Sequence, residues 1–466
     1  MISSTFDKNK VFTVMWSEIE GRIDCGFYKP EYNSVVKKIK SKNHIKLGNL
    51  VEFVNSSWDQ KSIYKDKFPY IEIGTVNLID GSISSMKQVE VKNAPSRAKK
   101  VVYSGDVIVS ATRPSRGAVV LINEDQDKSI CSTGFIVLRD IKNTLYNKKA
   151  LQLLLRTSFV LKQCEQRQSG GNYPAITESE YKKILVPAIN DVNKIELISS
   201  VWDKAISDRI EKLKQAEDLL KSIDAYLLSE LNLQLPELKN GLANRKYIVN
   251  SKEIIGNRFD PSYHSKQYEL FLQECNKKNI ELLKLKDICS NIYQGVGRCL
   301  TDDKSNILLK VKNILPENQI DYSDIEYVDN PPKNKQLQVG DIISPFIGEA
   351  IRQFKFSVFN NNGNYFVDNN TGVIRLKQKY NVLYVCAILN SKIMRFQIER
   401  LIGGGVPFIG TTGAKELLIP IVDNKIQNNI ALHIAKIYDN IGTLKIEAQQ
   451  CIESARAQIE QIILGE

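Results

Sequence analysis

The sequence contains few of the side chains that usually build metal sites and nucleophilic active sites. Only three histidines occur among 466 residues, His44, His264 and His433, and they lie far apart. The eight cysteines include no Cys-x-x-Cys pair, the spacing typical of zinc sites and redox motifs. We therefore expect no histidine-based metal site or catalytic triad, and we expect the cysteines to be reduced thiols of a cytoplasmic protein.

Long apolar runs are also missing. No stretch approaches the roughly 18–20 apolar residues that a membrane-spanning helix needs, and Met1–Val14 lacks the charged and apolar regions of a secretory signal. The composition, 42% hydrophobic and 25% charged, is that of a globular protein. The length allows two or three domains, and no association with a membrane is expected.

Positive charge is in excess, with 64 Lys and Arg against 53 Asp and Glu and a formal net charge of +11. A polyanionic partner would account for this excess, because Lys and Arg that neutralise phosphates release counterions. An AT-rich genome, which enriches Lys, Asn and Ile, would account for it equally well. Charge alone does not distinguish a nucleic-acid-binding protein from one with a biased composition, so the domain architecture is needed to distinguish them.

Short motifs recur in the same order in the two halves of the chain. Arg22-Ile23-Asp24 is answered by Arg258-Phe259-Asp260, an offset of 236 residues (258 − 22). Leu185-Val186-Pro187 is answered by Leu418-Ile419-Pro420, an offset of 233 residues (420 − 187). The other recurring pairs are Asn77 and Asn313, Gly105–Ser110 and Gly340–Ser344, Thr133-Gly134 and Thr371-Gly372, and Ser169–Pro174 and Gly403–Pro407. A collinear series of this length predicts a tandem duplication.

Each half follows the same plan: short β-rich runs, a helix, a Gly-rich loop, a short strand ending in proline, and a long helix. In the long helices, apolar residues recur at steps of three and four, which is the pattern of a coiled-coil seam. The expected seam residues are Ile206, Ile210, Leu213, Leu220, Ile223 and Leu227 in the central helix, and Ile430, Ile434, Ile437, Ile441, Leu444 and Ile462 in the C-terminal one. Because each helix has one apolar stripe, we expect the two to pair within the chain. Packing of each helix on its own head, and dimerisation of the chain, are the alternatives.

The predicted fold class is α+β, with two similar mixed α/β domains, each followed by a long helix, and an antiparallel coiled coil with pseudo-two-fold symmetry. A helix of about 40 residues is about 60 Å long, which would separate the two heads by one to two turns of B-DNA. The expected segments are a first head at 1–188, a central helix at 189–236, a second head at 237–422 and a C-terminal helix at 423–466.

On these motifs and their duplicated order, the chain resembles the specificity subunit of a Type I restriction-modification system over essentially its whole length. The resemblance implies two target-recognition domains that each read one half of a bipartite site in double-stranded DNA. It also implies helices that dock two modification (methyltransferase) subunits, together with restriction and translocase subunits. S-adenosylmethionine, ATP and Mg²⁺ would then be cofactors of those partners, with none in this chain. The Gly-rich loops differ, with Ser169-Gly170-Gly171-Asn172 in the first half and Gly403-Gly404-Gly405-Val406 in the second.

Direct reading of bases requires side chains on loops that can reach the base edges, where Arg suits guanine and Asn or Gln suits adenine. The candidate DNA-binding residues are Ser57, Trp58, Arg113, Arg116, Asn172 and Tyr173 in the first head, and Gln294, Arg298, Arg352, Gln353 and Phe408 in the second. For each of them a solvated loop residue is the alternative interpretation. Trp58 and Phe408 could equally be core residues.

Enzymatic motifs are present only in degenerate form. Asn330-Pro331-Pro332 approaches the motif of adenine methyltransferases, but Lys333 stands where an aromatic side chain would stack on the flipped base. Gly405–Thr412 has the glycine spacing of a phosphate-binding loop without its lysine. The favoured hypothesis is a non-catalytic DNA-binding subunit. A stand-alone methyltransferase or nuclease using Asn330, and a coiled-coil scaffold that binds no DNA, are the alternatives.

Overall fold

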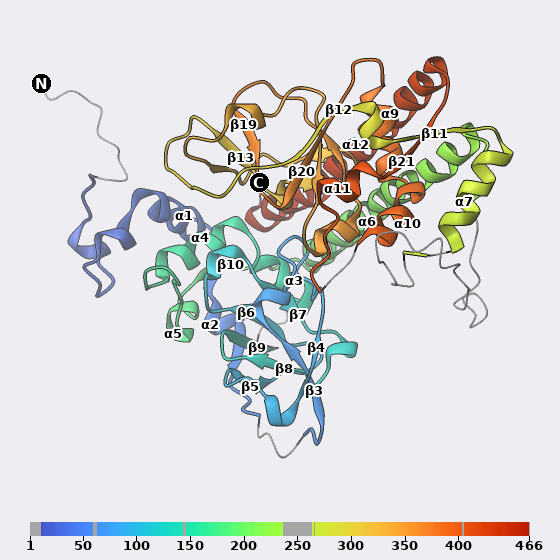
Figure 1. The fold of residues 1–466 in the computed structure, drawn as a ribbon. Helices are drawn as coiled ribbons and strands as arrows, with labels where there is room; N and C mark the ends of the chain where they lie inside the picture. Colours follow the sequence, from blue (N-terminus) through green and yellow to red (C-terminus); the bar gives the residue numbers. More distant parts are fainter. Residues whose placement is uncertain are drawn as a thin grey trace, which may run out of the picture. The chain divides into compact units, whose positions relative to one another are not determined.

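The computed structural model describes residues 11–58, 63–142, 146–235, 263–264, 266–402 and 405–465. The chain divides into two compact units, one formed by Met1–Lys212 with Ile446–Glu466 and the other by Leu213–Lys445 (Figure 1). Each unit holds one globular head and a part of each long helix, α6 (Val192–Glu230) and α12 (Asn424–Leu464). Among the described helices, none combines the length and the apolarity needed to cross a bilayer.

The first head is built on a four-stranded antiparallel sheet covered by helices. The strand order is β2 (Val51–Val54), β9 (Phe135–Ile141), β6 (Val107–Ser110) and β7 (Val119–Leu121). A second sheet has the order β4 (Lys87–Glu90), β3 (Lys67–Ile71), β8 (Ile130–Ser132) and β5 (Ala98–Val101), and β1 (His44–Lys46) pairs with β10 (Leu185–Pro187). The helices are α1 (Pro30–Lys40), α2 (Leu47–Leu50), α3 (Lys148–Leu154), α4 (Ser158–Arg167) and α5 (Glu178–Tyr181). All four residues of β6 are buried, which suits a β-branched strand at the centre of a sheet.

The second head repeats this plan. Its main sheet has the order β12 (Cys289–Gln294), β20 (Thr371–Leu376), β17 (Ile342–Pro345) and β18 (Ser357–Val358). The smaller sheets contain β16 (Glu326–Tyr327), β13 (Ile307–Leu309) and β19 (Tyr365–Val367); β14 (Ile314–Leu315) and β15 (Gln319–Ile320); and β11 (Glu281–Lys284) and β21 (Leu418–Ile421). The helices are α7 (Lys266–Lys277), α8 (Leu285–Ile288), α9 (Val382–Asn390), α10 (Lys392–Leu401) and α11 (Gly410–Lys415).

Strand pairing confirms the predicted duplication. Each main sheet joins its strands in the same order and entirely antiparallel, and each second sheet contains one parallel pair, β3 with β8 and β13 with β19. In each head the first strand also pairs with the short strand that contains the Leu-Val-Pro or Leu-Ile-Pro motif. The recurring motifs therefore mark equivalent places in two copies of one fold.

The recurring Gly-Asp motif is a structural element in both heads. The Asp106 carboxylate accepts two hydrogen bonds from Arg139, both at 2.9 Å, and the Asp341 carboxylate accepts two from Arg375, both at 2.7 Å. Both aspartates are only 1% exposed. Each carboxylate also accepts a backbone N–H of its own turn, from Tyr103 or Gln338. The motif thus closes a turn and anchors it to the neighbouring strand, which explains why it survives in heads that otherwise diverge.

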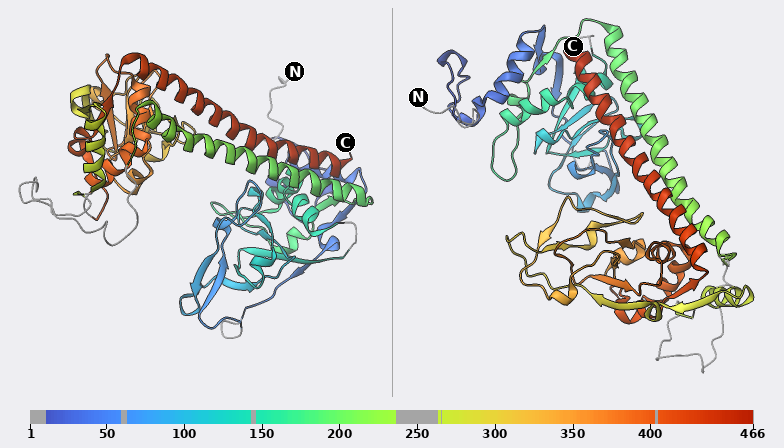
Figure 2. Two further views of the ribbon diagram at one scale, coloured as in Figure 1. Left: turned by 90° about the vertical axis from the view of Figure 1, so that its right-hand side faces the viewer. Right: turned by 90° about the horizontal axis from the view of Figure 1, so that it is seen from above.

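The two long helices run antiparallel and pack together within each unit (Figure 2). In the first unit, Trp202 and Ala205 of α6 share a hydrophobic core with Ile452 and Ile459 of α12. In the second unit, the shared core is made by Ala216, Ile223 and Leu227 of α6 and Ile430, Ile434, Ile437 and Ile441 of α12. The residue numbers rise along one helix as they fall along the other. The predicted pairing of the helices within the chain is confirmed.

The central helix does not present all the side chains that its apolar pattern suggested. Ile210 is 60% exposed, so its assignment to the seam was wrong. The positions that face α12 there are Arg209, whose guanidinium donates to the carbonyl of Ala448 at 3.4 Å, and Lys212, which pairs with Glu447 at 2.5 Å. Arg209, Lys212 and Ala216 continue the steps of four and three that begin with Trp202 and Ala205. None of these three is a large apolar residue, so the apolar pattern does not indicate them. Four of the other expected seam residues are partly buried and pack at the edges of the two cores: Ile206, Leu220, Leu444 and Ile462. Leu213 is partly exposed.

The packing of α6 predicts unequal effects of two similar substitutions in this helix. Ile223→Ala is expected to lower the free energy of unfolding by about 2–4 kcal/mol, because it leaves a cavity in a packed core. Ile210→Ala is expected to change it by less than about 0.5 kcal/mol, because the side chain is mostly in solvent. Urea denaturation followed by helical circular dichroism would compare the two. Equal losses would contradict the corrected helix packing.

Burial divides the cysteines into two groups. Cys25 and Cys299 are exposed and Cys451 is half-buried, whereas the other five are buried. Burial raises the pKa of Cys131, Cys164, Cys289 and Cys386 to about 12 and that of Cys275 to about 11. Thiolates react and thiols do not, so we expect three of the eight cysteines to react with Ellman's reagent at pH 8, and all eight in urea. Rapid reaction of more than three in the folded protein would contradict the buried placements.

Candidate nucleic-acid interface

The first head holds two of its candidate segments against each other. The chain that leaves β6 passes through residues 111–113, and the loop 169–175 folds over it. Ser169 and Ala175 exchange two backbone hydrogen bonds of 2.8 Å, which close the loop between them. The backbone N–H of Ile176 then donates to the carbonyl of Ala111 at 2.9 Å. The Gly-rich loop is therefore fixed to the rigid central strand of the sheet.

Arg113, Asn172 and Tyr173 meet at this junction. The backbone N–H of Arg113 donates to the carbonyl of Pro174 at 2.7 Å, and its guanidinium donates to the carbonyl of Asn172 at 3.1 Å. The guanidinium carbon lies 4.6 Å from the centre of the Tyr173 ring, whose side chain is 72% exposed. All three residues are candidates from the sequence, but nothing in the sequence shows that they form one cluster.

The second head has the same junction with other side chains. The backbone N–H of Gly348 donates to the carbonyl of Pro407 at 2.8 Å, and that of Ile409 donates to the carbonyl of Phe346 at 3.1 Å. Gly348 thus stands where the first head has Arg113, and Val406 stands where it has Tyr173. Val406 and Phe408 are 64% and 49% exposed. Residues 403 and 404 of this loop lie outside the described residues.

Of the remaining candidates of the first head, only Arg116 lies beside this junction, since its backbone N–H donates to the carbonyl of Arg113 at 3.1 Å. Ser57 is exposed, and Arg116 is exposed at the end of a short 3₁₀ helix (Pro114–Arg116). Trp58 is 5% exposed and its ring lies 4.5 Å from that of Phe68, so it packs in the core beneath its loop. In this structure Trp58 supports the loop and has no surface to offer a ligand.

In the second head, Gln294 ends β12 and Arg298 follows in the next loop. Arg298 pairs with the fully buried carboxylate of Asp368 at 2.6 Å, and this hydrogen bond raises the pKa of Arg298. Arg352 and Gln353 are exposed in a 3₁₀ helix (Glu349–Gln353) that begins one residue after Gly348. Arg352 lies 3.3 Å from Glu349. These two residues, unlike Arg298, belong to the same junction as Phe408.

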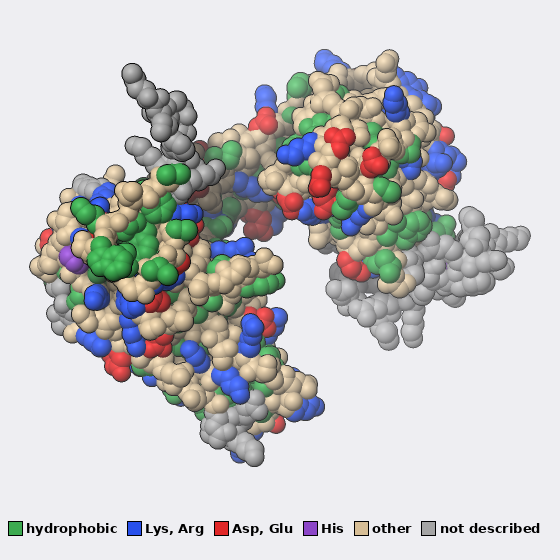
Figure 3. All heavy atoms as spheres, turned by 90° about the vertical axis from the view of Figure 1, so that its left-hand side faces the viewer, with side chains coloured by type: hydrophobic (Ala, Val, Ile, Leu, Met, Phe, Trp, Pro, Cys, Tyr) green, Lys and Arg blue, Asp and Glu red, His purple; other side chains and the backbone are tan. Residues whose placement is uncertain are grey.

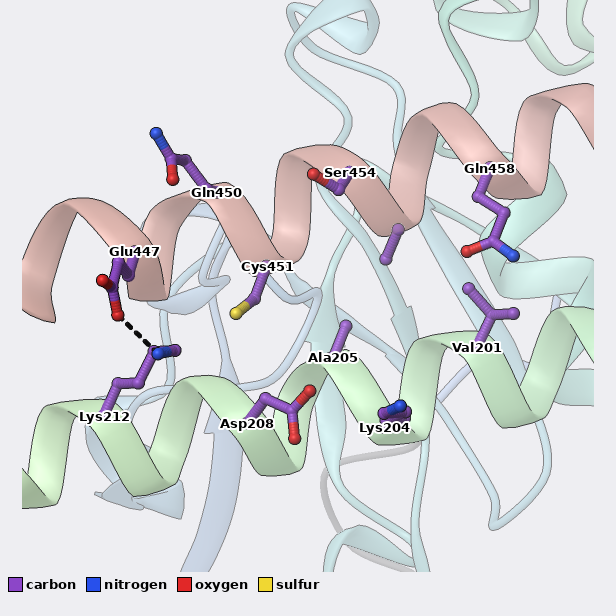
Figure 4. A pocket seen from close by; sticks show the side chains of 11 residues that line it. Val201, Lys204, Ala205, Asp208, Lys212, Glu447, Gln450, Cys451, Ser454 and Gln458 are labelled. Carbon is purple, nitrogen blue, oxygen red and sulfur yellow. Dashed lines mark hydrogen bonds and ion pairs between the residues drawn. The ribbon is translucent and has the colours of Figure 1, made fainter.

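A groove along the paired helices was not anticipated from the sequence. It has a volume of about 630 Å³ and lies between α6 and α12 in the first unit (Figure 4). Small and polar side chains line it, among them Ala205, Ser454, Ala455 and Cys451, and the Lys212–Glu447 ion pair closes one end. Small residues at helical spacing give only a weak hydrophobic pattern, so the sequence does not predict the groove.

Surface charge is mixed on the one face of the molecule that Figure 3 draws. On the face shown in Figure 3, Lys and Arg side chains are interspersed with Asp, Glu and neutral side chains. Within the described parts of the chain, no three His, Cys, Asp or Glu side chains are grouped so that they could hold a metal ion. Asn330, on which the methyltransferase hypothesis depends, adopts a left-handed conformation (φ 40°) in the segment that precedes a 3₁₀ helix (Lys333–Lys335). That segment forms a turn.

Comparison with known proteins agrees with this arrangement. Residues 40–228 match the sequence profile described as the Type I restriction modification DNA specificity domain. The Type I restriction enzyme HindI specificity subunit of Haemophilus influenzae is 26% identical over 154 residues, which cover 31% of this chain and 33% of that protein. The chain thus aligns with about a third of the length of that curated relative.

Two solved structures are similar over most of the chain. A chain from a study of complex assembly and conformational transition of the type I R-M system aligns with 90% of this chain and 97% of its own length, at a TM-score of 0.52 and 18% identity. The HsdS subunit from Thermoanaerobacter tengcongensis aligns with 91% of this chain and 96% of its own length, at a TM-score of 0.39 and 18% identity. The first likeness shows a shared fold.

The sequence match covers the first head from residue 40 onward and most of α6, and the shared fold extends to both heads. Residues 40–228 are therefore similar to the Type I restriction modification DNA specificity domain, and the chain is similar to a Type I specificity subunit over 154 residues.

Proposed function

We propose that the chain is a non-catalytic DNA-binding subunit that reads a bipartite target and directs partner methyltransferase and restriction subunits to it. The observation that carries this proposal is the junction found in both heads. Two copies of one fold present an exposed loop at the same place, with Arg113 and Tyr173 in one copy and Gly348 and Val406 in the other. A scaffold that varies its loops but keeps their support is suited to reading two different half-sites.

The test of DNA binding is a salt titration with the purified full chain. If Lys and Arg contact phosphates, the logarithm of the affinity for duplex DNA should fall linearly with the logarithm of the salt concentration. The expected slope is about −0.9 per phosphate contacted. Fluorescence anisotropy with a labelled duplex pool would measure it. Absence of binding at low salt, in the presence and absence of the partner subunits, would favour a scaffold role and contradict the proposal.

The division of the chain that we propose has target-recognition domains at 1–188 and 237–422 and conserved helices at 189–236 and 423–466. Two modification subunits, together with restriction and translocase subunits, are the proposed partners, and the cytoplasm is the proposed location. S-adenosylmethionine, ATP and Mg²⁺ would be used by those partners. We expect the purified chain to transfer no methyl group to DNA, and the co-expressed complex to do so. Methyl transfer by the chain alone that is lost in Asn330→Ala would instead establish the methyltransferase alternative.

A further inference from the structure

We propose that Arg113 contacts a guanine in the half-site of the first head through its guanidinium group, which is stacked on the ring of Tyr173. The inference rests on the proposed DNA-binding function and deepens it by naming one reader and its base. The backbone of Arg113 has φ 49° and ψ 53°, a left-handed conformation that residues with a side chain rarely adopt.

The other copy of the fold shows what this position needs structurally. Gly348 occupies the equivalent place and makes the equivalent hydrogen bond to Pro407; its φ is also positive (89°), but its ψ is 175° where that of Arg113 is 53°. Glycine satisfies the turn without steric cost. The Arg113 side chain is therefore not required to build the junction, and its presence in a strained conformation points to a role outside the fold.

The side chain is held in a conformation suited to recognition. Stacking on the Tyr173 ring and one hydrogen bond to the Asn172 carbonyl limit its rotamers, so less entropy is lost when a ligand binds. The guanidinium has five N–H donors, and the hydrogen bond to Asn172 uses one on a single terminal nitrogen. A bidentate contact to the O6 and N7 atoms of guanine needs two donors in one plane.

The neighbouring groups favour a base edge over a phosphate as the target. The exposed Tyr173 ring gives the cluster an apolar face beside the charge, and the loop that carries it is closed by the paired backbone of Ser169 and Ala175. A planar guanidinium can also pair with a phosphate, but only at a base edge do its paired donors distinguish guanine from the other bases. The second head offers Gly348 and Val406 here, so guanine reading at this place belongs to the first half-site alone.

The test is selection of bound sequences from duplex DNA with a randomised central region, using the full chain. We expect the unmodified chain to enrich a two-part sequence with a G·C pair at one fixed position in one part. Arg113→Gly should lose the preference at that position, with affinity for the enriched sequence reduced about 5- to 150-fold, and should keep all other positions. Its denaturation midpoint should be equal or higher, because glycine relieves the left-handed backbone.

Two further variants separate base reading from a general effect of charge. Arg113→Lys keeps the charge but not the paired donors, so it should lose most of the preference as well. Arg97→Ala removes an equal charge from an exposed position of the same head and should leave the enriched sequence unchanged. If Arg113→Gly weakens binding to all sequences equally, the residue contacts phosphate, and if it changes nothing, it reads no base; either result overturns the inference. Failure of the unmodified chain to enrich any sequence would instead refute the proposed function itself.

Discussion

Asp341→Ala is expected to lower the free energy of unfolding of the second unit by about 3 kcal/mol. Removing one partner of a buried ion pair leaves the other charge uncompensated, at a typical cost of 3–5 kcal/mol. The carboxylate of Asp341 is 1% exposed and holds Arg375 through two hydrogen bonds of 2.7 Å. We expect the lower end of the range, because the Arg375 side chain keeps 21% of its exposure and can be partly solvated. Urea denaturation of the full chain would measure the change.

An aspartate in the same unit provides the control. Asp324 pairs with Lys312 on the surface, where its side chain is 71% exposed, so Asp324→Ala should leave the denaturation midpoint nearly unchanged. The double variant Asp341→Ala with Arg375→Met should recover part of the loss, since no buried charge remains. If both single variants behave alike, the recurring Gly-Asp motif has another role than anchoring the turn.

Exchange of residues 1–188 for the first head of a relative with another target is expected to change one half of the recognised site completely and to leave the other half as it was. The first head has its own sheets, and the core that it shares with α6 and α12 is separate from that of the second unit. Loss of a whole half-site should reduce affinity for the original sequence about 10³-fold or more. Mapping of methylated adenines after co-expression with the partner subunits would show both halves.

The exchanged head must keep its contacts to the retained helices. Ser158 donates two hydrogen bonds to the Glu460 carboxylate, and Arg456 of α12 donates to the carbonyls of Leu78 and Ile79. The same exchange with Glu460→Ala would show whether a failed hybrid lacks this docking or lacks modular recognition. A hybrid that folds but alters both halves of the site would contradict independent reading by the two heads.

Much of the fold was predictable because duplication leaves a signal that does not depend on any one residue. Motifs such as Gly105-Asp106 and Gly340-Asp341 lie at equivalent turns, and their order was enough to predict two copies of one architecture. The reason for the motif was not predictable, because Arg139 and Arg375 lie on other strands and are brought to the aspartates only by the sheet.

The errors and omissions also have physical causes. The apolar pattern favours Ile210 over its polar neighbour Arg209 as a seam residue, although polar side chains with long apolar stems can occupy such positions. Trp58 was a candidate contact because its segment is polar, and a buried ring beneath a polar loop leaves no trace in the sequence. The equivalence of Arg113 and Gly348 rests on backbone hydrogen bonds between loops that share almost no residues.

The polar middle of the helix pair has a consequence for how the helices find each other. Sliding one helix along the other by a heptad would keep apolar side chains against apolar ones at most positions. It would also move Lys212 away from Glu447 and Arg209 away from the carbonyl of Ala448. Buried or half-buried polar residues at such positions lower stability but disfavour every misaligned register. This short charged segment thus favours a single register of two helices whose apolar patterns are otherwise repetitive.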